Sequence, residues 1–175
     1  MASQDEGLDA VDAAWDLVLT SVRDLTDEQA RGDSRLPGWT RGHLLTHCAR
    51  SADGVRGCAE SVARGELAVQ YPDGADGRAR DIEAGSGRPA AELVRDVTQA
   101  QAALMAAFRA LPDDAWPTPA EALTGTRTMA EYVTGRRREL LVHLVDLDVG
   151  VEPEDLPLDY RAADVTWLAE FRPDW

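Results

Sequence analysis

Hydrophobic residues recur along the chain at intervals of three and four positions, the spacing of the buried stripe of an amphipathic helix. Four long segments show this period: 8–25, 41–64, 89–111 and 129–149. Thr40 is suited to cap the second helix, Pro89 stands in the first turn of the third, and Gly150 closes the fourth. A shorter helix is predicted over 157–171. Because no segment of any length alternates between apolar and polar residues, we predict no strands.

These elements predict an all-α fold, an antiparallel four-helix bundle with a short extra C-terminal helix. Two connections are long: Gly65–Gly87 is polar and rich in glycine, and 111–128 joins the third and fourth helices. Long connections in a compact domain are commonly functional, so we expect a site at one end of the bundle. The length of 175 residues predicts a single domain over 1–175.

The charge balance excludes some classes of partner. The chain carries 18 basic residues, all of them Arg, against 32 acidic ones, a formal net charge of −14. Affinity for nucleic acid and for anionic lipid depends on clustered basic side chains, so we expect neither as a partner. No apolar run approaches the roughly 20 residues that span a bilayer, and the acidic N-terminus lacks a signal-peptide pattern. We therefore expect a cytoplasmic protein.

The histidines of the chain offer a candidate metal site. His43 and His47 lie on the second predicted helix, and His143 lies on the fourth, one turn after Glu139. Four residues advance a helix by about 400°, so Glu139 and His143 point in nearly the same direction. Such a pair can bind a divalent metal, and His47 from a facing helix would complete an open, three-residue coordination shell. A simple surface pair has the same spacing and is the alternative interpretation.

The neighbours of this pair indicate which side of the helix it occupies. At 100° per residue, one polar stripe flanked by leucines and valines runs along the helix and consists of Tyr132, Arg136, Glu139, His143 and Asp146. Because a bundle helix normally turns an apolar stripe to the core, this pattern predicts an internal polar cavity, with a solvent-facing stripe as the alternative. Asp146 lies near the C-terminal end of the predicted helix, where the helix dipole disfavours a carboxylate. A role in accepting the N–H of a metal-bound imidazole would explain why a carboxylate stands there.

Three segments of the chain resemble a known family. They are, in order, LPGWTRGHLLTHCARSADG, RARDIEAGSGRPAAELV and RRRELLVHLVDLDVG. Together they are similar to the metal-binding domain of mycothiol-dependent maleylpyruvate isomerases, which are DinB-like four-helix bundles, and the resemblance covers about residues 8–158. It implies a divalent metal, zinc, bound by His47, Glu139 and His143. His43 matches a histidine that often precedes the ligand, and it is interpreted either as a residue supporting the ligand or substrate, or as a core histidine.

The resemblance also implies mycothiol as a cofactor, a thiol of actinobacteria, and the composition typical of a GC-rich genome fits that source. A metal can lower the pKa of a bound thiol and so provide a thiolate at neutral pH. The thiolate could add to an alkene and leave again after rotation, which is isomerisation, or stay attached to an electrophile, which is S-transfer. We predict an enzyme of one of these kinds acting on a small electrophile. A metal-dependent hydrolase and a noncatalytic metal-binding bundle are the alternatives.

Carboxylates on such an electrophile would need cations. Arg78 best matches a functionally important arginine of the family, although Arg80 is only two positions away. Arg136 is an independent candidate, because it projects within about 20° of His143 and could bind a carboxylate bidentately. A salt bridge to Glu139 is its alternative role.

The resemblance ends soon after VDLDVG, where typical members carry a further C-terminal domain, and we expect no such second domain in this protein. We therefore expect an electrophile other than maleylpyruvate to be at least as suitable. We also expect the exposed end of the bundle to be covered by self-association, as a homodimer.

Overall fold

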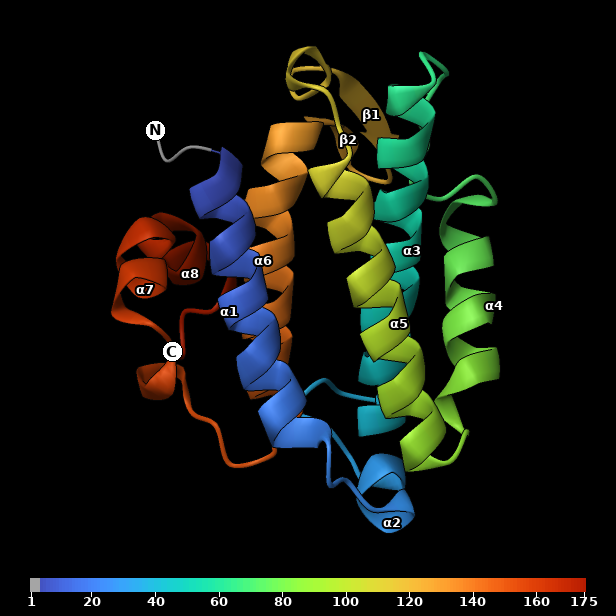
Figure 1. The fold of residues 1–175 in the computed structure, drawn as a ribbon. Coiled ribbons are helices and arrows are strands. Elements are labelled where there is room, and N and C mark those ends of the chain that lie inside the picture. The colour runs from blue at the N-terminus through green and yellow to red at the C-terminus, as the bar shows by residue number, and fades with distance from the viewer. Residues whose placement is uncertain (1–3) are drawn as a thin grey trace.

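Four long helices lie side by side in the computed structural model, which describes residues 4–175 (Figure 1). They are α1 (Gln4–Val22), α3 (Arg41–Ala63), α5 (Ala90–Arg109) and α6 (Met129–Asp146). α1 and α6 run in one direction, and α3 and α5 run in the other (Figure 1). The predicted all-α bundle is confirmed, and its two helix pairs are antiparallel to each other. Within each pair the helices are parallel.

Local sequence signals set the beginnings of the two helices that carry the site. Thr40 caps α3 as predicted: its hydroxyl accepts the backbone N–H of His43, and Nδ1 of His43 accepts the backbone N–H of Thr40. Thr128 and Glu131 form the same reciprocal arrangement at the start of α6. Each of these reciprocal arrangements, known as a capping box, satisfies two backbone N–H groups that the start of a helix leaves free. Both helices therefore begin at a defined residue.

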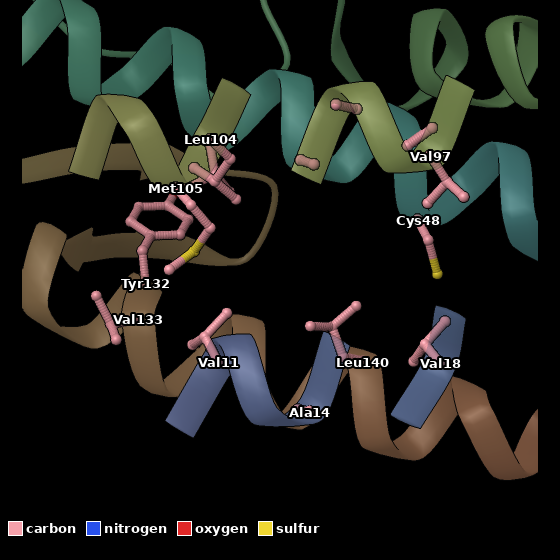
Figure 2. Close-up of a cluster of buried hydrophobic side chains, with 14 of the residues drawn as sticks. Val11, Ala14, Val18, Cys48, Val97, Leu104, Met105, Tyr132, Val133 and Leu140 are labelled. Carbon is pink, nitrogen blue, oxygen red and sulfur yellow. The ribbon is translucent and has the colours of Figure 1, made fainter. Parts of the chain in front are cut away.

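The core lies between the helix pairs and uses the predicted apolar stripes. Figure 2 shows Val11 and Val18 of α1 facing Leu140 of α6, with Val97 and Leu104 of α5 across the bundle. These side chains are buried, and the cluster continues through the whole bundle. The two cysteines, Cys48 and Cys58, are both buried and free. Since Leu140 and its neighbours pack on both sides of the polar stripe of α6, they fix the rotation of that helix.

Both long connections contain regular elements, although no helix or strand was predicted in either. The segment expected to be an irregular loop contains α4 (Gly74–Ser86), which returns the chain between the parallel helices α3 and α5 (Figure 1). α4 buries only Gly77 and Ile82, so it has no apolar stripe for periodicity to detect. The other connection contains η1 (Asp113–Ala115) and a hairpin of β1 (Pro119–Ala122) and β2 (Gly125–Thr128), so the prediction of no strands was wrong. Strands of four residues are too short to show alternation.

Smaller differences occur at the ends of the bundle. A short α2 (Asp27–Arg31) follows α1, and α6 ends a few residues before the predicted end. After η2 (Pro153–Asp155), the predicted C-terminal helix is two helices, α7 (Leu158–Ala163) and α8 (Val165–Phe171), which meet at Asp164. Within residues 4–175, none of the helices has the length and apolar character needed to cross a membrane.

Candidate functional site

One side chain from α3 and two from α6 converge inside the bundle. Nε2 of His47 is 3.1 Å from Oε1 of Glu139, and the ring centroids of His47 and His143 are 5.0 Å apart. One donor atom from each of the three side chains lies within 4.8 Å of the others. The structure thus brings together the trio that helical spacing selected, while its identity as a ligand set stays a prediction.

The polar stripe of α6 faces inward, as predicted. Tyr132, Arg136 and Asp146 are buried, and Glu139 and His143 are partly buried. The stripe therefore lines an internal polar region, and the solvent-facing alternative is wrong.

His143 is held in one orientation by a buried carboxylate. Its Nδ1 lies 2.9 Å from Oδ2 of Asp146, which is 2% exposed. The same Asp146 oxygen accepts a hydrogen bond of 2.7 Å from Nη2 of Arg172, which directly follows α8. Because Nδ1 donates its proton to this carboxylate, the lone pair of the imidazole is at Nε2 and is free to bind a metal. Asp146 therefore has the supporting position predicted for it.

His47 has a different partner. Nη2 of Arg78, on α4, is 2.9 Å from Nδ1 of His47. A guanidinium can only donate hydrogen bonds, so Nδ1 accepts here and Nε2 carries the proton. Coordination of a metal through Nε2 needs the opposite tautomer, with the proton on Nδ1. Of the two candidate arginines, Arg78 reaches the trio, and Arg80 is exposed.

The electrostatics favour an ionised Glu139 and a neutral His47. Burial alone would raise the pKa of Glu139, but His47, by its charge when protonated and by a hydrogen bond, together with His143 and the permanent cation Arg136, holds it well below its usual range. Burial lowers the pKa of His47, although Glu139 opposes that change. A carboxylate and neutral imidazoles are the forms that bind metals. Moreover, Oε1 of Glu139 is buried and has no well-aligned hydrogen-bond partner, a costly arrangement that a bound cation would relieve.

Arg136 does not lie where a substrate-binding arginine was expected. It is 3% exposed, its Nε donates to Oε1 of Gln101 at 2.9 Å, and its Nη1 donates to the carbonyl oxygen of Cys48 at 3.2 Å. Its Nη2 is buried without a partner. The charge of the buried Arg136 lowers the pKa of Glu139, so Arg136 is a fixed cation beside the trio.

His43 lies one turn before His47 and has other contacts. Besides its role in the cap of α3, its Nε2 is 3.2 Å from Oε2 of Glu83. The indole of Trp39 stacks on His43, with ring centroids 6.2 Å apart, and meets the edge of His47, with centroids 5.6 Å apart. Of these contacts of His43, only the one with Trp39 leads to a member of the trio, because Trp39 also contacts His47.

One pocket is lined by members of the trio, and a second is lined by Arg78, the partner of His47. The larger, which we call the α6–α8 pocket, has a volume of about 300 Å³. It is lined by two members of the trio together with cationic and apolar side chains: Arg127, Gly135, Arg138, Glu139, Val142, His143, Trp167 and Arg172. The second, the α3–α4 pocket, has a volume of about 210 Å³, and its lining includes Tyr71 and Arg78. Burial raises the pKa of Tyr71, so this phenol keeps its proton beside Arg78. Glu139 and His143 thus line the first pocket, and Arg78 connects His47 to the second.

Residues 11–148 match the sequence model of the mycothiol maleylpyruvate isomerase N-terminal domain. The chain belongs to this family. The crystal structure of a mycothiol-dependent maleylpyruvate isomerase is similar, with a TM-score of 0.86 and 25% identity over 97% of this chain and 72% of that chain. The structure of a histidine-to-alanine variant of that isomerase has the same TM-score at 24% identity and the same coverage. No curated protein sequence matches the chain significantly.

As a member of the mycothiol maleylpyruvate isomerase N-terminal domain family, the protein is an enzyme of the isomerase or transferase kind. The match ends at residue 148, yet Trp167 and Arg172 line the pocket beside the trio. Sequence reasoning missed both residues, and it missed Tyr71 as well. No spacing relation connects them to the trio, because the tertiary fold alone brings them near it.

Proposed function

We propose that the protein is a divalent-metal-dependent, mycothiol-using enzyme that isomerises a small electrophile or transfers the thiol to it. The observation that carries the proposal is the convergence of His47, Glu139 and His143 to within 4.8 Å beside an open pocket. Membership in the mycothiol maleylpyruvate isomerase N-terminal domain family supports the choice of thiol and of reaction.

The residues present fit a divalent metal. Two imidazoles and one carboxylate form a donor set typical of catalytic zinc, which keeps a position for a further ligand. The buried Oε1 of Glu139 has no well-aligned hydrogen-bond partner, and Asp146 fixes the imidazole of His143 with Nε2 free. Zinc held there would lower the pKa of a thiol that reaches it.

The surrounding side chains would bind and orient the reactants. Arg78, once it no longer donates to Nδ1 of His47, would have its guanidinium free to bind an anionic group of a reactant. Arg127 lines the α6–α8 pocket and is exposed, so it provides a further cation there. Arg136 was predicted to bind a substrate carboxylate directly. Its buried contacts favour an indirect role through the charge of Glu139.

The remaining parts of the proposal come from the sequence. They are zinc as the ion, a cytoplasmic enzyme of actinobacterial type, maleylpyruvate or another small electrophile as the substrate, and a homodimer. Each can be examined separately from the site.

Metal analysis of the purified protein, followed by turnover assays with and without mycothiol, tests the proposal. Maleylpyruvate and a panel of small unsaturated or electrophilic acids would serve as substrates. The proposal expects bound zinc and turnover that requires mycothiol. Turnover without the thiol would support a metal-dependent hydrolase, and bound metal without turnover of any substrate would support a noncatalytic bundle.

A further inference from the structure

The C-terminal helix α8 reaches the candidate metal site through a single buried carboxylate. Oδ2 of Asp146 accepts from Nη2 of Arg172 at 2.7 Å and lies 2.9 Å from Nδ1 of His143. We infer that Arg172 is a positioning residue for His143, and that it couples the docking of α8 to the affinity for the metal. This inference rests on the proposed function, because it assumes that His143 is a metal ligand.

Asp146 needs a cation in this position. Its side chain is 3% exposed and lies at the C-terminal end of α6, where the helix dipole adds negative potential. Among the described residues, its ion-pair partners are His143 and Arg172. Without Arg172, the only remaining partner would be a neutral imidazole, since a ligating histidine binds a metal in its neutral form. A buried carboxylate left in that state is costly, and it would turn toward water and release the imidazole.

The guanidinium of Arg172 has a second contact, with an aromatic ring. Its Cζ lies 5.3 Å from the ring centroid of Trp175, which restricts the side chain from the other side. Arg172 therefore connects the end of α8 to His143 through two consecutive hydrogen bonds, and its position depends on where α8 lies.

α8 forms part of the wall of the α6–α8 pocket. Arg138 of α6 forms a two-pronged ion pair with Asp164, at 2.7 Å and 2.6 Å, and its Cζ lies 4.8 Å from the ring centroid of Trp167. Trp167 and Arg172 line the pocket together with Glu139 and His143. α8 has seven residues and is too short to be stable alone, so its conformation depends on these contacts.

The coupling must act in both directions. If docking of α8 strengthens metal binding at His143, then metal binding must stabilise docked α8 to the same extent. The family match ends at residue 148, so the inference assigns a function to a segment beyond the matched domain.

The test measures zinc affinity of the full chain by competition with a chromophoric chelator. Arg172→Leu removes the ion pair, and Arg172→Lys restores the charge. Asp159→Ala is the matched control, because it removes the 2.6 Å ion pair between Arg137 and α7 without touching Asp146. Outer partners of metal ligands typically contribute 10- to 100-fold in affinity, so we expect Arg172→Leu to weaken zinc binding about tenfold. Arg172→Lys should recover part of the loss, and Asp159→Ala should bind zinc like the unaltered protein.

Hydrogen exchange provides the reciprocal measurement. Saturating zinc should slow amide exchange in α8 of the unaltered protein and should have little effect there in Arg172→Leu. Circular dichroism checks that the bundle of each variant remains folded.

Two outcomes would overturn the inference, and they differ in what else they affect. If Arg172→Leu loosens α8 but binds zinc as tightly as the unaltered protein, Arg172 is only a structural contact and the proposed function survives. If the unaltered protein itself binds no zinc, both the inference and the metal part of the proposed function are wrong.

Discussion

Arg78 and His47 are joined by a contact of 2.9 Å that fixes which nitrogen of the imidazole carries a proton. The guanidinium donates, so Nδ1 of His47 accepts and Nε2 is protonated. A metal at Nε2 requires the proton to be on Nδ1 instead. Arg78 and a metal at Nε2 therefore require opposite tautomers of His47 and cannot both bind it. Binding of the metal would release the guanidinium for another partner.

Replacing Arg78 should consequently strengthen metal binding while it impairs turnover. Arg78→Met removes both the competing hydrogen bond and a positive charge near the trio. A hydrogen bond from a charged group is worth about 1.5–3 kcal/mol, so we expect zinc affinity to rise about tenfold or more. Isothermal titration with zinc measures the change, and Arg80→Met is the exposed control two residues away. A loss of zinc affinity in Arg78→Met would contradict the competition.

Two glycines of α3 set how closely the crossover that carries Arg78 can approach. A Cβ at Gly42 would lie 2.1 Å from the carbonyl oxygen of Ser86, and one at Gly54 would lie 2.6 Å from that of Gln70. Ser86 is the last residue of α4 and Gln70 lies in the segment before it, so Gly42→Ala should displace the end of α4 from α3 and destabilise the protein.

Gly57 provides the matched comparison within the same helix, because a Cβ there would meet no atom within 4 Å. Gly57→Ala should stabilise the protein by up to about 1 kcal/mol through helix propensity alone. Urea unfolding of both variants measures the difference. Equal changes in the free energy of unfolding for Gly42→Ala and Gly57→Ala would show that the close approach of α3 to the end of α4 does not require glycine at residue 42.

The stability of the metal-free protein should fall on acidification in two stages. The pKa of His47 is lowered below 6.5 in the folded state by burial, so the unfolded chain takes up a proton first and stability decreases as the pH falls below about 6.5. The pKa of Glu139 is lowered below 4.5 by the neighbouring positive charges despite its burial, so a further decrease begins below about 4.5. Thermal unfolding between pH 7 and pH 4 measures both stages.

His47→Asn separates the two stages. This variant should show a smaller change in stability between pH 7 and pH 5, because the imidazole that causes the change is gone. An unchanged slope in that range would show that His47 is not the residue whose pKa is lowered.

Neither cysteine should act as the nucleophile. Burial raises the pKa of Cys48 to about 12 and that of Cys58 to about 11, so both are thiols at neutral pH. In the native protein we expect no reaction with a thiol reagent at pH 8, and two reacting thiols after unfolding in guanidinium. A Cys48→Ala/Cys58→Ala variant should retain mycothiol-dependent turnover. Loss of turnover in a folded variant would mean that the reacting sulfur belongs to the chain.

The central part of the site was predictable because helical geometry is local. A separation of four residues places Glu139 and His143 on one side of α6, and a separation of three places Asp146 beside His143. The polar stripe flanked by leucines also predicted that this side faces inward. The same reasoning did not reveal the contacts of Arg136 with Gln101 and Cys48, since a shared direction on a helix does not tell whether a side chain ends in a pocket or in the core.

The rest of the site depends on contacts between elements that are distant in sequence. α4 has few buried side chains, so no periodic signal marked it as a helix or distinguished Arg78 from Arg80. Trp167 lies on the short helix α8, and Arg172 directly follows it. The position of this helix follows from ion pairs to α6 rather than from an apolar stripe of its own. Such contacts are specified only by the assembled fold.

The zinc content of four single variants tests the central claim most directly. His47→Ala, Glu139→Gln and His143→Ala each remove one proposed ligand, and His43→Ala is the control one turn before His47. Elemental analysis after gel filtration should find zinc bound to the unaltered protein and to His43→Ala, and little in the other three, with helical circular dichroism preserved in all. A full equivalent of zinc in folded His47→Ala and His143→Ala would show that the metal is held elsewhere.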